Sequence, residues 1–207
     1  MTVTELPGAT LRTVHVSQMD NVCYLLTCSA TGAQLLVDAA DDAPALLSMI
    51  SAGSARLDLV VTTHRHWDHH RALPAVVSAT GARTAAGVDD ADELPVPVDD
   101  RLSNGDTVVV GDLSLDVAHL RGHTPGSVAL VWRDADDGTH AFTGDSLFPG
   151  GVGKTTSPEA FTSLLDDVTS RLFDVLPDAT HVYPGHGAGT TLGAERPHLD
   201  EWRQRGW

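Results

Sequence analysis

Histidine and aspartate side chains with the spacing of metal ligands stand in one short segment of the chain. Residues 63–70 read THRHWDHH, and the pattern H-x-H-x-D-H within them directly follows the apolar run LDLVV. Neutral imidazole and carboxylate groups are common protein ligands of zinc and iron. Four such groups at the end of a buried strand would be costly to bury unpaired. In a turn, His64 and His66 can point to one metal, and Asp68 and His69 can then reach a second.

Single residues that can bind metal follow three more predicted strands, each beside a glycine. His123 lies in GHTPGS, Asp145 in TGDSL and His186 in PGHG. Glycine lets the backbone turn tightly and approach a site closely. Each residue alone carries little weight. Together with the first segment they predict seven ligands at one end of a sheet.

Strands and helices that the hydrophobic pattern predicts must position these residues. Apolar runs predict strands at residues 11–16, 21–28, 34–38, 57–61, 107–110, 113–120, 127–133, 140–143 and 180–183. Helical periodicity and capping residues predict helices at residues 41–51, 72–80, 158–173 and 194–205, and the acidic residues 87–100 should form a loop over a sheet edge. Strand runs that each end with a helix, in two halves, favour two packed sheets with helices outside.

The composition limits the classes of protein to which the chain can belong. Its 207 residues fit one domain, which we expect to span residues 1–207. The formal net charge of −15 disfavours binding to nucleic acid and to anionic membranes. The chain lacks an apolar run of about 20 residues and a basic, apolar leader, so we expect no membrane segment and a cytoplasmic location. Cys23 and Cys28 are too few for a disulfide scaffold, which fits a reducing compartment.

The four motifs, in this order, resemble those of the metallo-β-lactamase superfamily of metal-dependent hydrolases. The likeness is strongest to the single-domain, glyoxalase II-like (hydroxyacylglutathione hydrolase-like) branch, and GHTPGS, FTGDSLF and YPGHGAGTTLGAER carry it. The resemblance implies an α/β fold, a four-layer αββα sandwich of two mixed sheets with helices outside and metals at one edge. It also implies two divalent metals, zinc first, with iron or manganese as alternatives. The implied ligands are His64, His66 and His123 for the first metal, Asp68, His69 and His186 for the second, and Asp145 as a bridge.

The resemblance implies a reaction as well. Two metals that share a water lower its pKa towards neutrality, and the resulting hydroxide attacks a carbonyl that a metal polarises. Asp68 and Asp145 would be the catalytic carboxylates that hold these metals. Lys154, the one lysine of the chain, occupies the place where similar glyoxalase II sequences carry a basic residue that contacts the substrate's carboxylate. We therefore expect a small-molecule, anionic thioester as substrate.

Other functions fit parts of the same pattern. The runner-up is a persulfide dioxygenase of the same branch, in which His64, His123 and Asp145 would hold a single iron. A lactonase with the same ligand set and a metal-binding protein without turnover are further alternatives. The segment GGVGKTT resembles the end of a phosphate-binding P-loop, but Phe148 stands where that pattern requires glycine. His70 begins the helix after the first motif and is expected not to bind metal.

Overall fold

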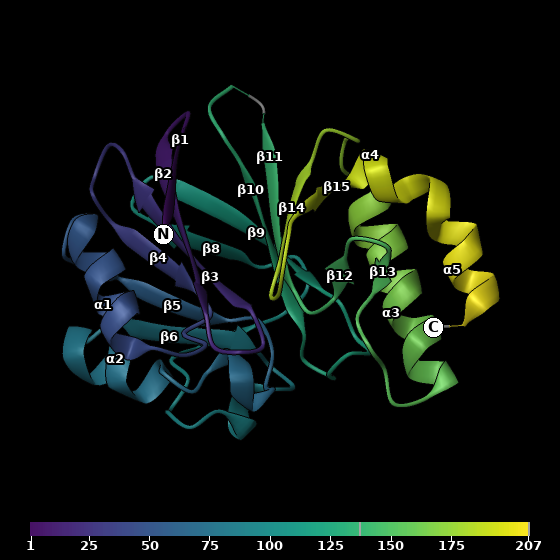
Figure 1. Cartoon of the computed structure of the whole chain (residues 1–207), viewed down its shortest axis with the longest axis horizontal. Coiled ribbons are helices and arrows are strands. Elements are labelled where there is room, and N and C mark those ends of the chain that lie inside the picture. The colour runs from purple at the N-terminus through teal and green to yellow at the C-terminus, as the bar shows by residue number, and fades with distance from the viewer. Residues whose placement is uncertain (137, 207) are drawn as a thin grey trace.

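Two β-sheets lie face to face between two groups of helices in the computed structural model, which describes residues 1–136 and 138–206 (Figure 1). The helices are α1 (Ala43–Ala52), α2 (Leu73–Thr80), α3 (Pro158–Val168), α4 (Leu192–Glu195) and α5 (Leu199–Arg205). Side chains of α1 and α2 pack on one sheet, and side chains of α3 and α5 pack on the other. The predicted four-layer αββα sandwich is therefore confirmed.

The first sheet has seven strands among the described residues, and their order in space is their order along the chain. The strands are β1 (Thr2–Leu6), β2 (Ala9–Val16), β3 (Asn21–Cys28), β4 (Gln34–Val37), β5 (Leu59–Thr62), β6 (Arg83–Gly87) and β7 (Asp100–Leu102). Pairing is antiparallel from β1 to β4 and parallel from β4 to β7. Successive side chains of a strand point to opposite faces. In β3, Val22 and Leu26 thus join the core between the sheets, while Cys23 and Leu25 join the core under the helices.

The second sheet has six strands within the described part of the chain, in the order β15-β14-β11-β10-β9-β8. The strands are β8 (Thr107–Val110), β9 (Leu113–His119), β10 (Val128–Arg133), β11 (Thr139–Gly144), β14 (His181–Pro184) and β15 (Thr190–Thr191). β11 and β14 pair parallel, and the other neighbours pair antiparallel. A separate hairpin, β12 (Leu147–Phe148) with β13 (Gly151–Val152), follows β11. Asp137, which follows β10 and precedes β11 in the sequence, and Trp207 lie outside the described residues.

Aromatic side chains tie the two sheets together close to the edge where the predicted ligands lie. The ring of Tyr24 on β3 meets Phe142 of β11 edge to face, with ring centroids 5.4 Å apart. Its hydroxyl donates a hydrogen bond of 2.7 Å to the carbonyl oxygen of Pro184. Beyond this contact, the backbone N–H of Val22 donates to the carbonyl oxygen of Gly185 at 2.8 Å. Strand ends from both sheets are therefore held in a fixed relation.

Six strands are absent from the sequence-based prediction: β1, β6, β7, β12, β13 and β15. β6 reads RTAAG, and its small side chains give neither alternation nor an apolar run. It forms a strand because it pairs between β5 and β7. The loop expected at residues 87–100 spans residues 88–99, between β6 and β7, with a turn of 3₁₀ helix at Ala91–Glu93. Tertiary pairing, rather than local propensity, thus decides the structure here.

Two predicted helices are interrupted in the structure. The helix expected at residues 158–173 is capped by Ser157, whose hydroxyl accepts the Ala160 N–H at 3.2 Å, but it is regular only to Val168. It continues as a π-helical turn, Thr169–Phe173. The terminal helix is split into α4 and α5 by a 3₁₀ turn. In the described part of the chain, no helix is long and apolar enough to cross a bilayer.

Candidate metal centre

The seven predicted ligands come together at one edge of the sandwich, beyond the carboxyl ends of strands from both sheets. Asp68 and His69 lie in a 3₁₀ turn after β5. The other ligands lie within four residues of a strand end: His64 and His66 after β5, His123 after β9, Asp145 after β11 and His186 after β14. Strands that run in one direction end at the same edge, where α/β proteins commonly bind their ligands. Residues that are far apart in sequence therefore meet here.

The first cluster consists of His64, His66 and His123, whose ligand atoms lie within 4.8 Å of one another. Nδ1 of His66 is 2.9 Å from Nε2 of His123. Nε2 of His64 is buried and has no hydrogen-bond partner. Since the His66 ring is exposed, the cluster is open to solvent on that side. Three ring nitrogens thus converge on one point that a small molecule can reach.

The second cluster consists of Asp68, His69 and His186, again with ligand atoms within 4.8 Å of one another. The Nε2 atoms of the two histidines are 3.1 Å apart. Oδ2 of Asp68 lies 3.2 Å from Nε2 of His186 and 3.4 Å from Nε2 of His69. The side-chain amide of Asn21 donates a hydrogen bond of 3.0 Å to the same carboxylate oxygen. Asn21 therefore fixes the orientation of Asp68, a role that the sequence pattern does not reveal.

Asp145 faces both clusters. Its Oδ2 lies 3.6 Å from Nε2 of His123 and 3.5 Å from Nε2 of His186. Its Oδ1 lies 3.4 Å from Nε2 of His69 and is buried without a hydrogen-bond partner. One carboxylate therefore stands between the histidines of the first cluster and those of the second.

Backbone carbonyl groups orient two of the histidines from the far side of the ring. Nδ1 of His123 is 2.7 Å from the carbonyl oxygen of Lys154, and Nδ1 of His186 is 2.8 Å from that of Met19. A carbonyl oxygen only accepts hydrogen bonds, so Nδ1 carries the proton in each neutral ring. Nε2 is then bare and points into the cluster. This is the tautomer that binds a metal through Nε2.

Asp38 is a functional residue that the sequence-based prediction missed. It is buried directly after β4, and its Oδ2 lies 2.9 Å from Nδ1 of His69. The same carboxylate accepts hydrogen bonds from the backbone N–H and the hydroxyl of Thr63, at 2.8 and 2.9 Å. The Thr63 hydroxyl also lies 3.1 Å from Nδ1 of His64. The available signal was an aspartate just after an apolar strand, as for Asp145, but without the neighbouring glycine.

Charges in the cluster shift the pKa values of its members in opposite directions. Burial lowers the pKa of His64 well below its ordinary value, which keeps this ring neutral. Burial would also lower the pKa values of His69 and His186, but neighbouring carboxylates outweigh it and raise each to about 10. Although burial opposes them, those histidines hold the pKa values of Asp68 and Asp145 below the ordinary range. The carboxylates thus favour positive charge in the cluster, which protons or a divalent metal can supply.

The donor set fits divalent metal cations. Nε2 of His64 and Oδ1 of Asp145 are buried polar atoms without partners, an arrangement that is costly unless another group pairs with them. Imidazole nitrogens and carboxylate oxygens in groups of three suit zinc, iron or manganese. Such three-residue sites leave coordination positions open for water or substrate. The residues present therefore match the metals that the sequence implied.

The backbone at two glycines comes so close to the proposed ligands that no larger residue fits there. A Cβ atom at Gly185 would lie 2.4 Å from Oδ1 of Asp145 and 2.6 Å from Cε1 of His69. A Cβ atom at Gly153 would lie 1.7 Å from the carbonyl oxygen of Asp145. These distances are shorter than real Cβ contacts. Gly185, the first glycine of PGHG, thus leaves room for the side chains of Asp145 and His69.

Lys154 lies next to the first cluster but does not belong to it. Its backbone carbonyl contacts His123, while its side chain is exposed and has no ion-pair partner among the described residues. Residues 148–154 and Arg205 line a cavity of about 270 Å³ beside it. His70 belongs to neither cluster, and its Nε2 lies 3.0 Å from the carbonyl oxygen of Arg65.

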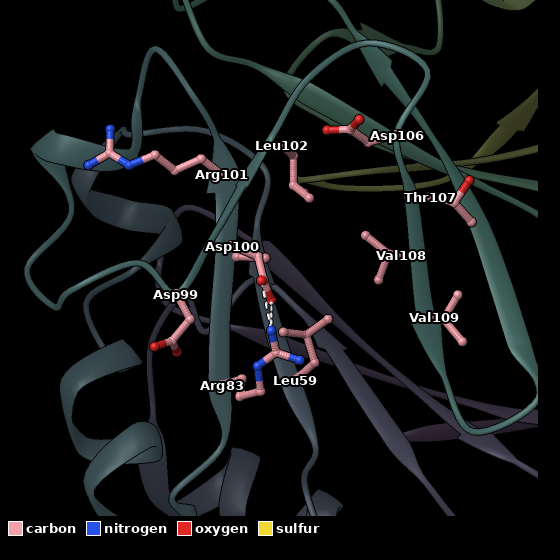
Figure 2. Close-up of a pocket in the computed structure, with 11 residues that line it drawn as sticks. Leu59, Arg83, Asp99, Asp100, Arg101, Leu102, Asp106, Thr107, Val108 and Val109 are labelled. Carbon is pink, nitrogen blue, oxygen red and sulfur yellow. Dashed lines mark hydrogen bonds and ion pairs between the residues drawn. The ribbon is translucent and has the colours of Figure 1, made fainter.

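A larger cavity, of about 510 Å³, lies between the edge strands β7 and β8 (Figure 2). None of the seven predicted ligands lines it. Figure 2 shows Arg83 directed at Asp100, with which it makes hydrogen bonds of 2.6 and 2.7 Å. Arg101 pairs in the same way with Asp92. Since these charges neutralise one another, we assign this cavity no part in the metal centre.

Comparison with known proteins agrees with this geometry. A model of the metallo-beta-lactamase superfamily matches residues 18–186. A hydroxyacylglutathione hydrolase of Jannaschia sp. (strain CCS1) is 38% identical over 167 residues, which cover 81% of this chain but only 62% of that protein. ETHE1 from Myxococcus xanthus superposes with a TM-score of 0.80 and 30% identity, over 94% of this chain and 84% of that one. TTHA1623 in a di-iron-bound form superposes with a TM-score of 0.72 and 29% identity, over 89% and 96%. The chain belongs to the metallo-beta-lactamase superfamily.

Proposed function

We propose that this protein is a metal-dependent hydrolase that cleaves a thioester at a centre of two divalent metals. In this proposal the first cluster holds one metal, the second cluster holds the other, and Asp145 contacts both. Zinc is the proposed metal, with iron or manganese as alternatives. The substrate is a small anionic thioester.

The position of Asp145 between two three-residue clusters is the observation that carries the proposal. A centre for one metal would need only one such cluster. Similarity to a protein that was solved in a di-iron-bound form supports two metals. Similarity to proteins named hydroxyacylglutathione hydrolase supports an acyl group carried on a thiol as the part that is cleaved.

Metals bound to these ligands would polarise the substrate carbonyl and make a water acidic enough to lose its proton near neutral pH. The residues of the chain hold and orient the ligands for that chemistry. Asn21 fixes the carboxylate of Asp68, and Asp38 holds the Nδ1 proton of His69. A thiolate is the leaving group, and a free thiol has a pKa of about 8.5, so a general acid contributes little.

Lys154 is proposed to bind the anionic end of the substrate. It lies beside His123, and a single exposed ammonium without an acidic partner is unusual in a chain of net charge −15. The adjoining cavity of about 270 Å³ brings Arg205 to the same place. Arg205 pairs there with Glu201 at 3.6 Å, so Lys154 is the cation that we propose captures a carboxylate and directs the thioester towards the clusters.

The test combines metal analysis with a substrate panel. We expect about two metals per chain, and hydrolysis of anionic thioesters that a chelator abolishes and zinc restores. One iron per chain with oxygen uptake on a persulfide would replace the proposal by a dioxygenase. Turnover of lactones but not of thioesters would replace it by a lactonase, and no turnover of any compound with metals bound would contradict catalysis.

A further inference from the structure

Asp90, a buried carboxylate outside both clusters, lies between the two loops that carry the first cluster. It follows β6, and its side chain is fully buried. Its Oδ2 accepts hydrogen bonds from the backbone N–H of Arg65 at 3.0 Å and from the hydroxyl of Thr124 at 2.5 Å. Its Oδ1 accepts a hydrogen bond of 2.9 Å from the backbone N–H of Gly126. One carboxylate thus links the loop after β5 to the loop after β9.

The partners of Asp90 adjoin all three histidines of the first cluster. Arg65 stands between His64 and His66, and Thr124 directly follows His123. Hydrogen bonds to a buried charged group are stronger than those between neutral groups. Asp90 therefore holds the backbone between His64 and His66, and it holds the loop of His123 through the Thr124 hydroxyl and the Gly126 N–H.

The motif GHTPGS is built around this carboxylate. The hydroxyls of Thr124 and Ser127 are 2.6 Å apart, and the Ser127 hydroxyl also accepts the Thr124 N–H at 3.2 Å. A Cβ atom at Gly126 would lie 2.4 Å from the backbone nitrogen of Asp90, so only glycine allows this approach. The residues after His123 thus form a cradle for Asp90. The motif therefore provides this support in addition to the ligand His123.

We propose that Asp90 is a positioning residue that holds His64, His66 and His123 together as a metal site before any metal binds. Ligands that are already ordered bind more tightly, because their ordering is not a cost of binding. The second cluster has no member in the loop after β9, and its two members in the loop after β5, Asp68 and His69, are held separately by Asn21 and Asp38. The link that Asp90 makes between the two loops therefore acts on the first cluster. This inference rests on the proposed ligand set. It does not depend on the thioester reaction.

Two single-site backgrounds test the inference with zinc alone. The His186→Ala chain leaves the first cluster intact, and the His123→Ala chain leaves the second intact. We expect Asp90→Asn to weaken zinc binding about 10- to 100-fold in the His186→Ala background, measured by competition with a chromophoric chelator. Zinc affinity in the His123→Ala background should not change. Hydrogen exchange of the Arg65 and Gly126 amides in the metal-free protein should become faster.

Two further variants separate positioning from general destabilisation. Asp134→Asn changes a carboxylate of similar burial, which accepts two backbone N–H bonds in the turn after β10, and should leave zinc affinity unchanged. Thr124→Val removes one donor to Asp90 while keeping the shape of the side chain, and should weaken zinc binding in the His186→Ala background alone.

If the Asp90→Asn protein does not fold, the Thr124→Val protein tests the inference by the same comparison of zinc affinity in the two backgrounds. Equal loss of zinc affinity in both backgrounds, or no loss in either, overturns the inference. A His186→Ala chain that binds no zinc overturns it as well, because the first site would then not exist. None of these outcomes depends on the thioester assay. The inference can therefore be wrong while the proposed activity is right, and the reverse.

Discussion

Asp38 and His69 form a buried pair, with Oδ2 of the aspartate 2.9 Å from Nδ1 of the histidine and both side chains almost inaccessible to solvent. The aspartate accepts a hydrogen bond from the Nδ1–H group, so Nε2 is the bare nitrogen of the neutral ring. That nitrogen faces the other members of the second cluster. A residue that touches no substrate therefore decides which ring nitrogen of His69 can bind a metal.

Asp38→Asn should lower metal affinity at the second cluster about 10- to 100-fold. The side-chain oxygen of the asparagine must accept the hydrogen bond from the Thr63 N–H. The NH₂ group of the same amide then faces Nδ1 of His69. His69 would then carry its proton on Nε2, where it blocks metal binding. Zinc titration of the His123→Ala background measures this effect. Unchanged affinity would mean that the pair does not set the tautomer.

Asp145→Ala should lose metal and activity together, because this carboxylate faces both clusters. Elemental analysis and thioester turnover, measured on the same sample, check the prediction. Asp166→Ala is the matched control, since Asp166 is exposed on α3 and pairs with Arg203 at 2.8 Å. The control should keep both properties. An Asp145→Ala enzyme with full metal content and turnover would remove Asp145 from the centre.

Lys154→Gln should raise KM for anionic thioesters about tenfold and leave kcat nearly unchanged. A tenfold change corresponds to ~1.4 kcal/mol, slightly below the range for a hydrogen bond to a charged group. KM for a neutral thioester should not move. Arg12→Gln removes the same charge from β2, where the guanidinium contacts Thr27, and should leave both constants as they are. An equal rise of KM for neutral and anionic substrates would show that Lys154 does not recognise charge.

Gly185→Ala should reduce metal content and activity, because its Cβ would lie 2.4 Å from Oδ1 of Asp145. Gly105→Ala is the contrasting variant. Gly105 has φ +85 and open space around it, so its replacement should cost stability, roughly 1–2 kcal/mol, and no metal. Thermal unfolding and metal analysis of both variants separate strain from interference with the ligands. A Gly185→Ala protein with two metals per chain would contradict the close approach.

The grouping of the seven proposed ligands could be predicted from the sequence because each carries its own local signal. His123, Asp145 and His186 each combine a donor, a preceding strand and a neighbouring glycine. Asp38 and Asp90 have no such glycine beside them, and their roles depend on residues that fold next to them from other strands. Asp38 contacts Thr63 at the end of the neighbouring strand, and Asp90 contacts Thr124 beyond a strand of the other sheet, so no spacing along the chain reveals either contact. Positioning residues of this kind are visible only in three dimensions.

The same distinction separates the predicted strands from the missed ones. β3 was predicted with its observed bounds, Asn21–Cys28, because it is apolar on both faces. β6 and β7 are short and carry alanine, glycine and charged residues, so they have no hydrophobic pattern of their own. They become strands only once β5 offers an edge for pairing. The local sequence thus specifies the central strands, whereas these strands near the edge form only by pairing with a neighbouring strand.

The hydrogen bond from Val22 to Gly185 joins the first sheet to the loop that holds His186. Contacts between such distant parts of a chain form late and slow folding, because a long loop must close, at a cost in entropy, before the contact contributes any stability. The metal centre completes only when both halves of the chain have docked. Metal binding should therefore be the last event of folding, and the rate at which refolding chains acquire zinc should report how quickly the two sheets meet.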